Sequence, residues 1–250
     1  MTTVFDPGEL LTRYTVPDRA RTHVRVNFVT SIDGAATHNG LTAGLNNEAD
    51  HQVFHTLRML SDVVLVGAGT VRQEGYEDLR VTPSQSRWRT EQGLPPHPVM
   101  AVISRSLDLD PAAPLFTRAP VRPLLFTTAD APAQQRRALM NVADVVTAGT
   151  DVVEPAQVVA ELSRRGLPQI LSEGGPVWFA AMIEAGVIDE MCLTLSPLLE
   201  GGRATRIARG GRQRSTPMSL VSVLRAEDML ILRYLRPDLA DRSMREPEGS

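Results

Sequence analysis

Short apolar runs rich in β-branched residues alternate along the chain with stretches whose apolar residues recur every three or four positions. The first pattern predicts buried strands and the second predicts amphipathic helices. Strands are expected at residues 24–30, 62–66, 99–103, 123–126, 143–147, 169–171 and 189–196. Helices are expected from residue 46 or 47 to residue 60, shortly after residue 70, at 130–140 and 155–165, and from residue 176 onward. Two more strands, at 220–224 and 229–235, are expected to close the fold as an antiparallel pair.

This alternation predicts an α/β fold with a mainly parallel central sheet flanked by helices and an antiparallel C-terminal hairpin. Residues 24–236 are expected to form one domain, because no shift in composition and no repeat marks a linker. Residues 1–23 are expected to be an N-terminal arm over the surface, 75–97 a loop and 237–250 a frayed tail. Ligands of such sheets bind beyond the carboxyl ends of the strands.

The most informative turn is Ser172-Glu173-Gly174-Gly175, which lies between a predicted strand and a helix opened by Pro176. Its glycines let backbone approach a ligand closely, and the free N–H groups of a helix start attract an anion such as phosphate. Glu173 is unfavourable beside a phosphate but well suited to accept hydrogen bonds from a second, donor-rich ligand. The turn therefore predicts a site shared by a nucleotide and a substrate, although an ordinary strand-to-helix turn has the same pattern.

A second turn of this kind contains Gly67, Gly69 and Thr70. It does not match the Rossmann pattern, because Arg72 stands where the third glycine belongs. Two glycines and a hydroxyl at the end of a strand nevertheless suit close approach of a nucleotide.

Two arginine positions add further candidates. Ser104 and Arg105 follow the strand at 99–103, where a hydroxyl and a guanidinium favour the 2′-phosphate of NADP over NAD. Arg58 ends the apolar face of a helix, where it could clamp a carboxylate or phosphate with two parallel hydrogen bonds. A solvated turn and an exposed helix-end arginine are the plain alternatives.

Composition excludes several classes of protein. The chain has no lysine, which rules out pyridoxal-type Schiff bases, lysine general bases and a P-loop kinase. Cys192 is the only cysteine, so disulfides and cysteine zinc sites are excluded and a cytoplasmic protein is expected. No membrane contact is expected, because neither an apolar run of membrane length nor a signal-peptide pattern is present. His51 and His55 are one helical turn apart, but Gln52 replaces the glutamate of the zincin pattern, so no metal is expected.

Nucleic acid is not an expected partner either. The net charge is −3, and the only dense basic segment lacks interleaved aromatic residues. A flap near phosphates or a solvated surface is favoured for this segment, whose arginines are Arg203, Arg206, Arg209, Arg212 and Arg214.

Taken together, six motifs in order resemble the reductase domain of riboflavin biosynthesis, within the dihydrofolate-reductase-like superfamily. They are Asn27–Gly34, His55-x-Leu57-Arg58, Asp62–Thr70, Ser172–Gly175, Ile188-Asp189-Glu190, and Ser196-Pro197 followed by Gly201-Gly202. The resemblance covers about residues 24–235. A stand-alone reductase is expected, because this sequence contains no His-x-Glu with a Pro-Cys-x-x-Cys partner, the pattern of the zinc deaminase half of the family.

The resemblance implies an NADPH-dependent oxidoreductase. The hydride would go to the opened ribosyl C1′ of 5-amino-6-(5-phosphoribosylamino)uracil, giving the ribitylamino compound. The turns and the resemblance together give as cofactor-binding residues Val29, Gly67, Gly69, Thr70, Glu74, Ser104, Arg105, Gly174, Gly175, Pro176, Val177 and Trp178. The substrate would contact Asn27, Thr42, Arg58 and Glu173, with Asp33 also at the floor of the site.

Roles follow for three charged residues. Glu173 would accept N–H groups of the uracil ring, and Arg58 would be the first choice for the 5-phosphate. Asp33 could relay the proton that the reaction needs, or it could simply belong to an Asp-Gly turn while water serves.

Some features of this sequence leave the substrate open. Residues 42–44 are Thr-Ala-Gly where many relatives have Ser-x-Trp, and 74–76 are Glu-Gly-Tyr where relatives often have Asp-x-Pro. Reduction of another heterocycle, such as dihydrofolate, stays an alternative, as does a nucleotide-binding protein without catalysis. A homodimer is expected from the resemblance and from the apolar strands late in the chain.

Overall fold

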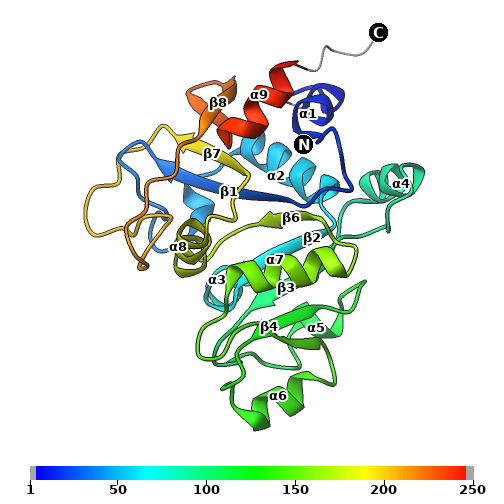
Figure 1. Ribbon diagram of the computed structural model, residues 1–250. Coiled ribbons are helices and arrows are strands. Elements are labelled where there is room, and N and C mark those ends of the chain that lie inside the picture. Colours follow the sequence, from blue (N-terminus) through cyan, green and yellow to red (C-terminus); the bar gives the residue numbers. More distant parts are fainter. Residues whose placement is uncertain (1–3, 246–250) are drawn as a thin grey trace.

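The computed structural model describes residues 4–245 of the 250-residue chain. These residues form a nine-stranded sheet in the order β5-β4-β3-β2-β6-β1-β7-β9-β8 (Figure 1). The strands are β1 (His23–Ser31), β2 (Val63–Gly67), β3 (Val99–Ile103), β4 (Leu124–Thr127), β5 (Asp144–Thr147), β6 (Gln169–Ser172), β7 (Glu190–Ser196), β8 (Ser219–Ala226) and β9 (Met229–Leu235).

The first seven strands of this order, from β5 at the edge to β7, run parallel to one another. β9 pairs antiparallel with β7, and β8 pairs antiparallel with β9. The predicted α/β fold, with its parallel sheet and C-terminal hairpin, is confirmed. β6 inserts between β2 and β1, so the order of the strands reverses there. A crevice for a ligand is expected at the carboxyl ends of strands beside such a reversal.

The helices cover both faces of the sheet. They are α1 (Pro7–Tyr14), α2 (Glu48–Leu60), α3 (Ala68–Glu74), α4 (Pro83–Glu91), α5 (Pro114–Thr117), α6 (Ala133–Leu139), α7 (Pro155–Arg164), α8 (Pro176–Ala185) and α9 (Pro237–Arg245), with a 3₁₀ turn η1 at Thr42–Gly44. Alternate residues of β2 enter two separate cores, as the two-residue period of a strand requires. Val64 and Val66 pack in the core with α1 and α2, whereas Val63 and Leu65 pack in the core with α7 and α8.

The segment expected to be an N-terminal arm contains α1, which belongs to the packed domain. The Asp6 carboxylate caps α1 by accepting the Glu9 N–H at 2.9 Å, and Pro7 occupies the first turn. Leu10 and Tyr14, one helical turn apart, are buried in the core with α2. The spacing of these two residues was the sequence signal for a helix. It was not recognised, because most other residues of the segment are polar.

The loop expected at residues 75–97 contains α4, so the prediction was wrong for this part. The Thr82 hydroxyl accepts the Gln85 N–H at 3.3 Å, and the Gln85 side chain accepts the Thr82 N–H at 3.0 Å. This reciprocal capping box and Pro83 start the helix. Arg89 is fully buried because its guanidinium donates to the carbonyls of Met59, Ser61 and Pro95.

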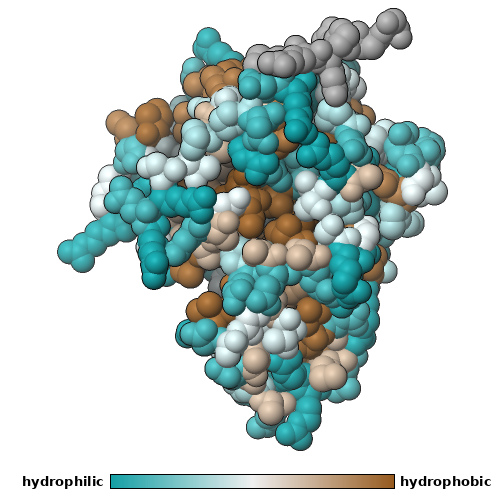
Figure 2. All heavy atoms as spheres, in the orientation of Figure 1, coloured by the Kyte–Doolittle hydropathy of each residue, from teal (hydrophilic) through white to brown (hydrophobic). Residues whose placement is uncertain are grey.

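The C-terminal segment also differs from the expected frayed tail. Residues 237–245 form α9, whose Ala240 is buried, and residues 246–250 lie outside the described residues. In Figure 2 polar side chains cover most of the face that carries α7, with apolar side chains gathered near the middle. No helix within residues 4–245 combines the length and apolarity needed to span a membrane.

Candidate active site

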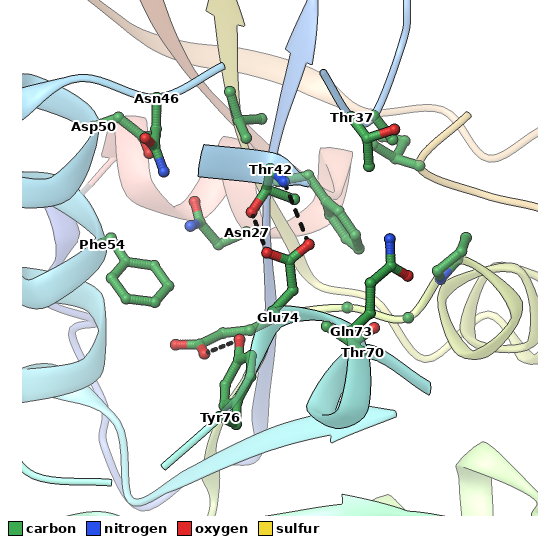
Figure 3. Close-up of a pocket in the computed structure, with 18 of the residues that line it drawn as sticks. Asn27, Thr37, Thr42, Asn46, Asp50, Phe54, Thr70, Gln73, Glu74 and Tyr76 are labelled. Atoms are coloured by element: carbon green, nitrogen blue, oxygen red, sulfur yellow. Dashed lines mark hydrogen bonds between the residues drawn. The ribbon is translucent and has the colours of Figure 1, made fainter. Parts of the chain in front are cut away.

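A cavity of about 470 Å³ lies at the carboxyl ends of β1, β2 and β6 (Figure 3). Asn27, Phe28 and Val29 of β1 line its floor together with Glu173 and Gly174 from the turn after β6. α2 and α3 contribute further walls. The volume is typical of a site for a small molecule, and the position is the one expected from the reversal in strand order.

The turn after β6 is joined to the end of β2. The Gly67 N–H donates to the Gly174 carbonyl at 2.9 Å, and a Cβ on Gly175 would lie 3.6 Å from the Gly67 Cα. Gly174 and Gly175 have φ of 116° and 75°, a conformation that favours glycine. The two glycine turns predicted from the sequence therefore contact each other and form a single unit.

This structure fits the phosphates of a dinucleotide. Gly175 caps α8 without any side-chain hydrogen bond, and Pro176 has no N–H of its own. The first-turn N–H groups of Val177 and Trp178 have no acceptor within the helix and remain for an anion. Thr70 lies beside this helix start, because a Cβ on Gly175 would lie 3.4 Å from the Thr70 hydroxyl.

Glu173 is held by two neighbours, Arg58 from α2 and Tyr76 from the loop after α3. Arg58 donates to both carboxylate oxygens, from Nε to Oε1 and from Nη2 to Oε2, each at 2.6 Å. The Tyr76 hydroxyl donates to Oε2 at 2.9 Å. Burial first and then Glu173 raise the pKa of Tyr76 well above its usual value, so the phenol keeps its proton. The Arg58 guanidinium also stacks on Phe54, 4.1 Å from the ring centroid.

This ion pair changes the chemistry expected for both residues. A guanidinium held by two charge-assisted bonds in a side chain only 16% exposed is not a free clamp for phosphate. Arg58 instead orients Glu173. Glu173 still lines the cavity, so its contact with a substrate ring stays a prediction.

A second contact joins a predicted substrate residue to a predicted cofactor residue. The Glu74 carboxylate accepts the Thr42 hydroxyl at 3.1 Å and the Thr42 N–H at 3.3 Å. In Figure 3 this contact lies between Asn27, Asp50 and Phe54 on one side and Thr70 and Gln73 on the other. Both residues line the same cavity, so the predicted substrate and cofactor positions adjoin each other.

Asp33 does not line the cavity. Its carboxylate accepts the Ser31 hydroxyl at 2.5 Å and the N–H groups of Glu200 and Gly201 at 3.1 and 2.7 Å. The Ser31 hydroxyl, followed by those two N–H groups, lowers the pKa of Asp33 to about 2. Asp33 therefore anchors the loop after β7, and this geometry does not favour its predicted role as a proton relay.

Comparison with known proteins identifies the family. A family model described as the RibD C-terminal domain matches residues 22–232. The chain belongs to this family. The 2,5-diamino-6-ribosylamino-4(3H)-pyrimidinone 5′-phosphate reductase of Archaeoglobus fulgidus is 27% identical over 187 residues, which are 73% of this chain and 84% of that protein. The riboflavin biosynthesis protein RibD of Mycobacterium tuberculosis is 28% identical over 186 residues, 74% of this chain and 45% of that protein.

A solved structure shares the fold of this RibD C-terminal domain. The pyrimidine reductase-like protein of Corynebacterium diphtheriae superposes with a TM-score of 0.84 at 23% identity, covering 92% of this chain and 98% of that one. The resemblance inferred from the six motifs is confirmed. Membership of this reductase family supports an oxidoreductase related to the pyrimidine reductases of riboflavin biosynthesis.

The predicted site residues of this RibD C-terminal domain fall into two groups. The cavity is lined by Asn27, Val29, Thr42, Arg58, Thr70, Glu74, Glu173, Gly174, Gly175 and Pro176. Outside its lining are Asp33, Gly67, Gly69, Ser104, Arg105, Val177 and Trp178. Ser104 is buried at the end of β3, where its hydroxyl accepts the Leu107 N–H at 3.0 Å, whereas Arg105 is exposed. Their contact with a 2′-phosphate stays a prediction.

Sequence reasoning missed several cavity residues, among them Asp50, Phe54 and Tyr76. Asp50 and Phe54 precede Arg58 at one-turn intervals on α2, so all three lie on one face of the helix. That spacing was the available signal for a shared helix face. Tyr76 belongs to the segment noted as atypical for the family.

Proposed function

We propose that the chain catalyses the NADPH-dependent reduction of 5-amino-6-(5-phosphoribosylamino)uracil to the ribitylamino compound. The observation that carries the proposal is the wall of the cavity in which Glu173 adjoins the glycine turn and the uncapped start of α8. Such a wall offers one ligand a carboxylate and another a set of backbone N–H groups. Both features lie in a chain of the RibD C-terminal domain family.

NADPH would rest on the glycine turn and the start of α8, with Thr70 beside its phosphates. When bound it supplies the hydride that goes to C1′ of the opened ribosyl group, and the protein supplies position and electrostatics. The ring of Phe28 packs against the ring of Phe179 from α8, with 4.4 Å between the two ring centroids. Phe28 therefore gives this part of the cavity a rigid apolar wall.

The pyrimidine ring would bind at Glu173. A carboxylate has about four acceptor positions, and three of them are used by Arg58 and Tyr76. The remaining position is on Oε1, which accepts only from Arg58 Nε. Glu173 would therefore accept one ring N–H, in an orientation fixed by its two neighbours.

Because Arg58 is occupied, the 5-phosphate needs another cation. A second cavity shares Thr37, Gln73, Pro176 and Thr205 with the first and is lined by Arg203 and Arg209. Within residues 4–245 neither arginine has a carboxylate at ion-pair distance, and Glu200 in the same cavity pairs with His38 at 2.8 Å. We assign these two arginines to a phosphate of the substrate or of the cofactor.

The direct test is an NADPH-oxidation assay with three substrates: the uracil named above, the 2,5-diamino pyrimidinone of the Archaeoglobus enzyme, and dihydrofolate. The uracil should be reduced fastest, and NADPH should be preferred to NADH. The Glu173→Ala variant should lose turnover while it still binds NADPH. Faster reduction of dihydrofolate, or NADPH oxidation that no substrate accelerates, would reject the proposal in favour of another heterocycle or of a non-catalytic protein.

We also propose that the chain forms a homodimer through the edge of the sheet. β8 is the last strand and, with β9, exposes Leu220, Val223 and Leu230, which are 52%, 50% and 37% exposed. Apolar side chains on an edge strand favour pairing or packing with a second copy. A monomer in light scattering at micromolar concentration would reject the dimer. The cytoplasm, expected from the cysteine content, stays a prediction.

A further inference from the structure

Asp50 is a carboxyl group in the cavity without a cation partner. It lies in the first turn of α2, where the Asn47 side chain accepts its N–H at 3.1 Å and so fixes the backbone. Its side chain reaches the cavity beside Asn46 (Figure 3). Oδ1 accepts the hydroxyl of Thr194, from β7, at 2.5 Å. The group is therefore held in one orientation between a helix and a strand.

Burial shifts Asp50 toward its neutral form. The residue is 7% exposed, and within the described residues no arginine or histidine lies at ion-pair distance from it. Burial raises the pKa of Asp50, and the Thr194 hydroxyl and the neighbouring His51 oppose that rise only in part. The other titratable groups lining this cavity are His51, Arg58, Glu74, Tyr76, Glu77, Asp78 and Glu173. Arg58, Tyr76 and Glu173 are bound to one another, and Glu74 is bound to Thr42.

The position of Asp50 suits a group that acts on the ribosyl part of a substrate. Asp50 and Arg58 lie two helical turns apart on the same face of α2, or about 12 Å along its axis. Arg58 marks the place of Glu173, where the pyrimidine ring would bind. A ribosylamino substituent extending from that ring along α2 would pass Phe54 and bring its sugar oxygen to Asp50.

The reaction consumes one proton, and Asp33, the residue predicted to relay it, binds the loop after β7 outside the cavity lining. This step rests on the proposed function. The C1′–O4′ bond must break, with its electron pair going to O4′, while the nitrogen lone pair forms a C1′=N bond. The hydride then forms the new C1′–H bond, and the C=N electron pair returns to nitrogen. O4′ becomes a hydroxyl only if an acid protonates it.

We propose that Asp50 is the catalytic acid that donates this proton to O4′ as the C1′–O4′ bond breaks. The carboxylate then regains a proton from solvent through the cavity. Thr194 is a positioning residue, because its hydroxyl holds Oδ1 and leaves Oδ2 for the substrate. General acids at such positions contribute about a hundredfold or more to turnover.

The test is the dependence of kcat on pH in Asp50→Asn and Thr194→Val. Wild-type kcat should fall as the pH rises through the raised pKa of Asp50, because the acid must be protonated. Asp50→Asn should lose about a hundredfold in kcat and show no such fall, with the Kd of NADPH within about twofold of wild type. Thr194→Val should move the fall to higher pH, because the lost hydroxyl had stabilised the carboxylate.

A second measurement needs no turnover. Carbon-13 NMR of the unliganded protein should show one Asp carboxyl that titrates above the usual range and disappears in Asp50→Asn. Asp50→Asn with wild-type kcat and pH profile would overturn the proposal, as would an Asp50 carboxyl that titrates in the usual range. If the wild-type protein reduces no pyrimidine, the proposed function is wrong. If the wild-type protein is active and Asp50→Asn is equally active, only the role of Asp50 is wrong.

Discussion

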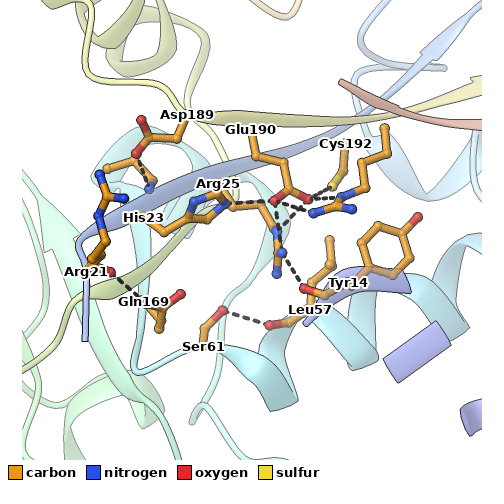
Figure 4. A network of polar contacts seen from close by, with 12 residues as sticks. Tyr14, Arg21, His23, Arg25, Leu57, Ser61, Gln169, Asp189, Glu190 and Cys192 are labelled. Carbon is orange, nitrogen blue, oxygen red and sulfur yellow. Dashed lines mark hydrogen bonds and ion pairs between the residues drawn. The ribbon is translucent and has the colours of Figure 1, made fainter. Parts of the chain in front are cut away.

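The two ends of the parallel sheet each bury a glutamate bound by arginine, but they use it differently. At the amino ends of β1 and β7, Glu190 is fully enclosed (Figure 4). Arg25 contacts both oxygens, at 3.0 Å to Oε2 and 2.9 Å to Oε1, and His23 contacts Oε2 at 2.7 Å. Arg233 also contacts both, at 2.7 Å to Oε1 and 3.2 Å to Oε2. At the carboxyl end of β6, Glu173 has one arginine and one tyrosine and opens onto the cavity.

The difference shows where a buried charge is structural and where it is available for a ligand. Burial alone would raise the pKa of Glu190, but Arg25 and Arg233 outweigh it and hold the pKa well below its usual value. Every acceptor position of Glu190 is used, since the Cys192 thiol also donates to Oε1 at 3.4 Å. Glu173 keeps one acceptor position, and Asp50 has no cation partner among the described residues. Of the carboxyl groups compared here, only those that line the cavity keep acceptor positions free for a ligand.

The largest effect should follow from removing the enclosed charge. Glu190→Gln leaves Arg25 and Arg233 without a counter-ion in the interior, which should lower the free energy of unfolding by about 3 to 5 kcal/mol. Urea unfolding at neutral pH measures it. The ion-pair contribution in the wild type is present above the usual glutamate pKa and is lost as the pH falls through the lowered one.

Glu161→Gln is the matched control for this prediction. Glu161 pairs with Arg164 and Arg165 on the exposed side of α7, where an ion pair contributes at most about 1 kcal/mol. If both variants lost the same stability, the enclosed network would have no special role.

Removing Arg58 should cost less stability but more activity. Arg58→Met leaves Glu173 with only Tyr76, and we expect a loss of about 2 kcal/mol, because the carboxylate lies at the wall of the cavity, where water replaces part of the lost contact. Turnover should be largely lost, since Glu173 is no longer oriented, while NADPH binding persists. Steady-state kinetics beside fluorescence titration with NADPH separates the two effects. Normal kcat/KM in this variant would contradict a positioning role.

How far the sequence predicted this comparison depends on the separation of the residues along the chain. The strands and the turn after β6 were predictable, because hydrophobic periodicity and glycine turns are local features. The Arg58–Glu173 pair joins residues 115 positions apart, and only the insertion of β6 between β2 and β1 brings them together. Each partner therefore looked free in the sequence and was assigned to a ligand.

The motif Ile188-Asp189-Glu190 shows that a family motif can be structural. It helped to identify the family, yet its acidic residues hold strands together outside the lining of the cavity. The Asp189 carboxylate accepts the Val24 N–H at 2.9 Å, and Glu190 binds the arginine network. A sequence pattern records that a carboxylate is needed, but not whether its partner is a ligand or another strand. Asp33 is a similar case, since it binds the loop after β7.

Arg203 and Arg209 test whether unpaired cations beside the cavity bind phosphate. The double Arg203→Gln, Arg209→Gln variant should weaken binding of a phosphorylated ligand by about tenfold for each arginine. A higher Kd for NADPH would assign them to the cofactor, and a higher KM for the phosphorylated pyrimidine alone would assign them to the substrate. Arg206→Gln removes one charge from the same loop without touching either cavity. If the double variant matched this control, the assignment would be wrong.

The smallest effect should come from Tyr76→Phe, which removes one donor from Glu173 and keeps the ring beside Arg58. Because the bond to a charged acceptor is lost while Arg58 still holds both oxygens, we expect a loss of at most about 2 kcal/mol. The freed position on Oε2 would let Glu173 accept a second N–H, so the preference between the uracil and the 2,5-diamino pyrimidinone should change more than NADPH binding. Ratios of kcat/KM for the two rings measure it. An unchanged ratio would mean that Tyr76 fixes Glu173 without selecting the ring, and the atypical segment would then have no part in specificity.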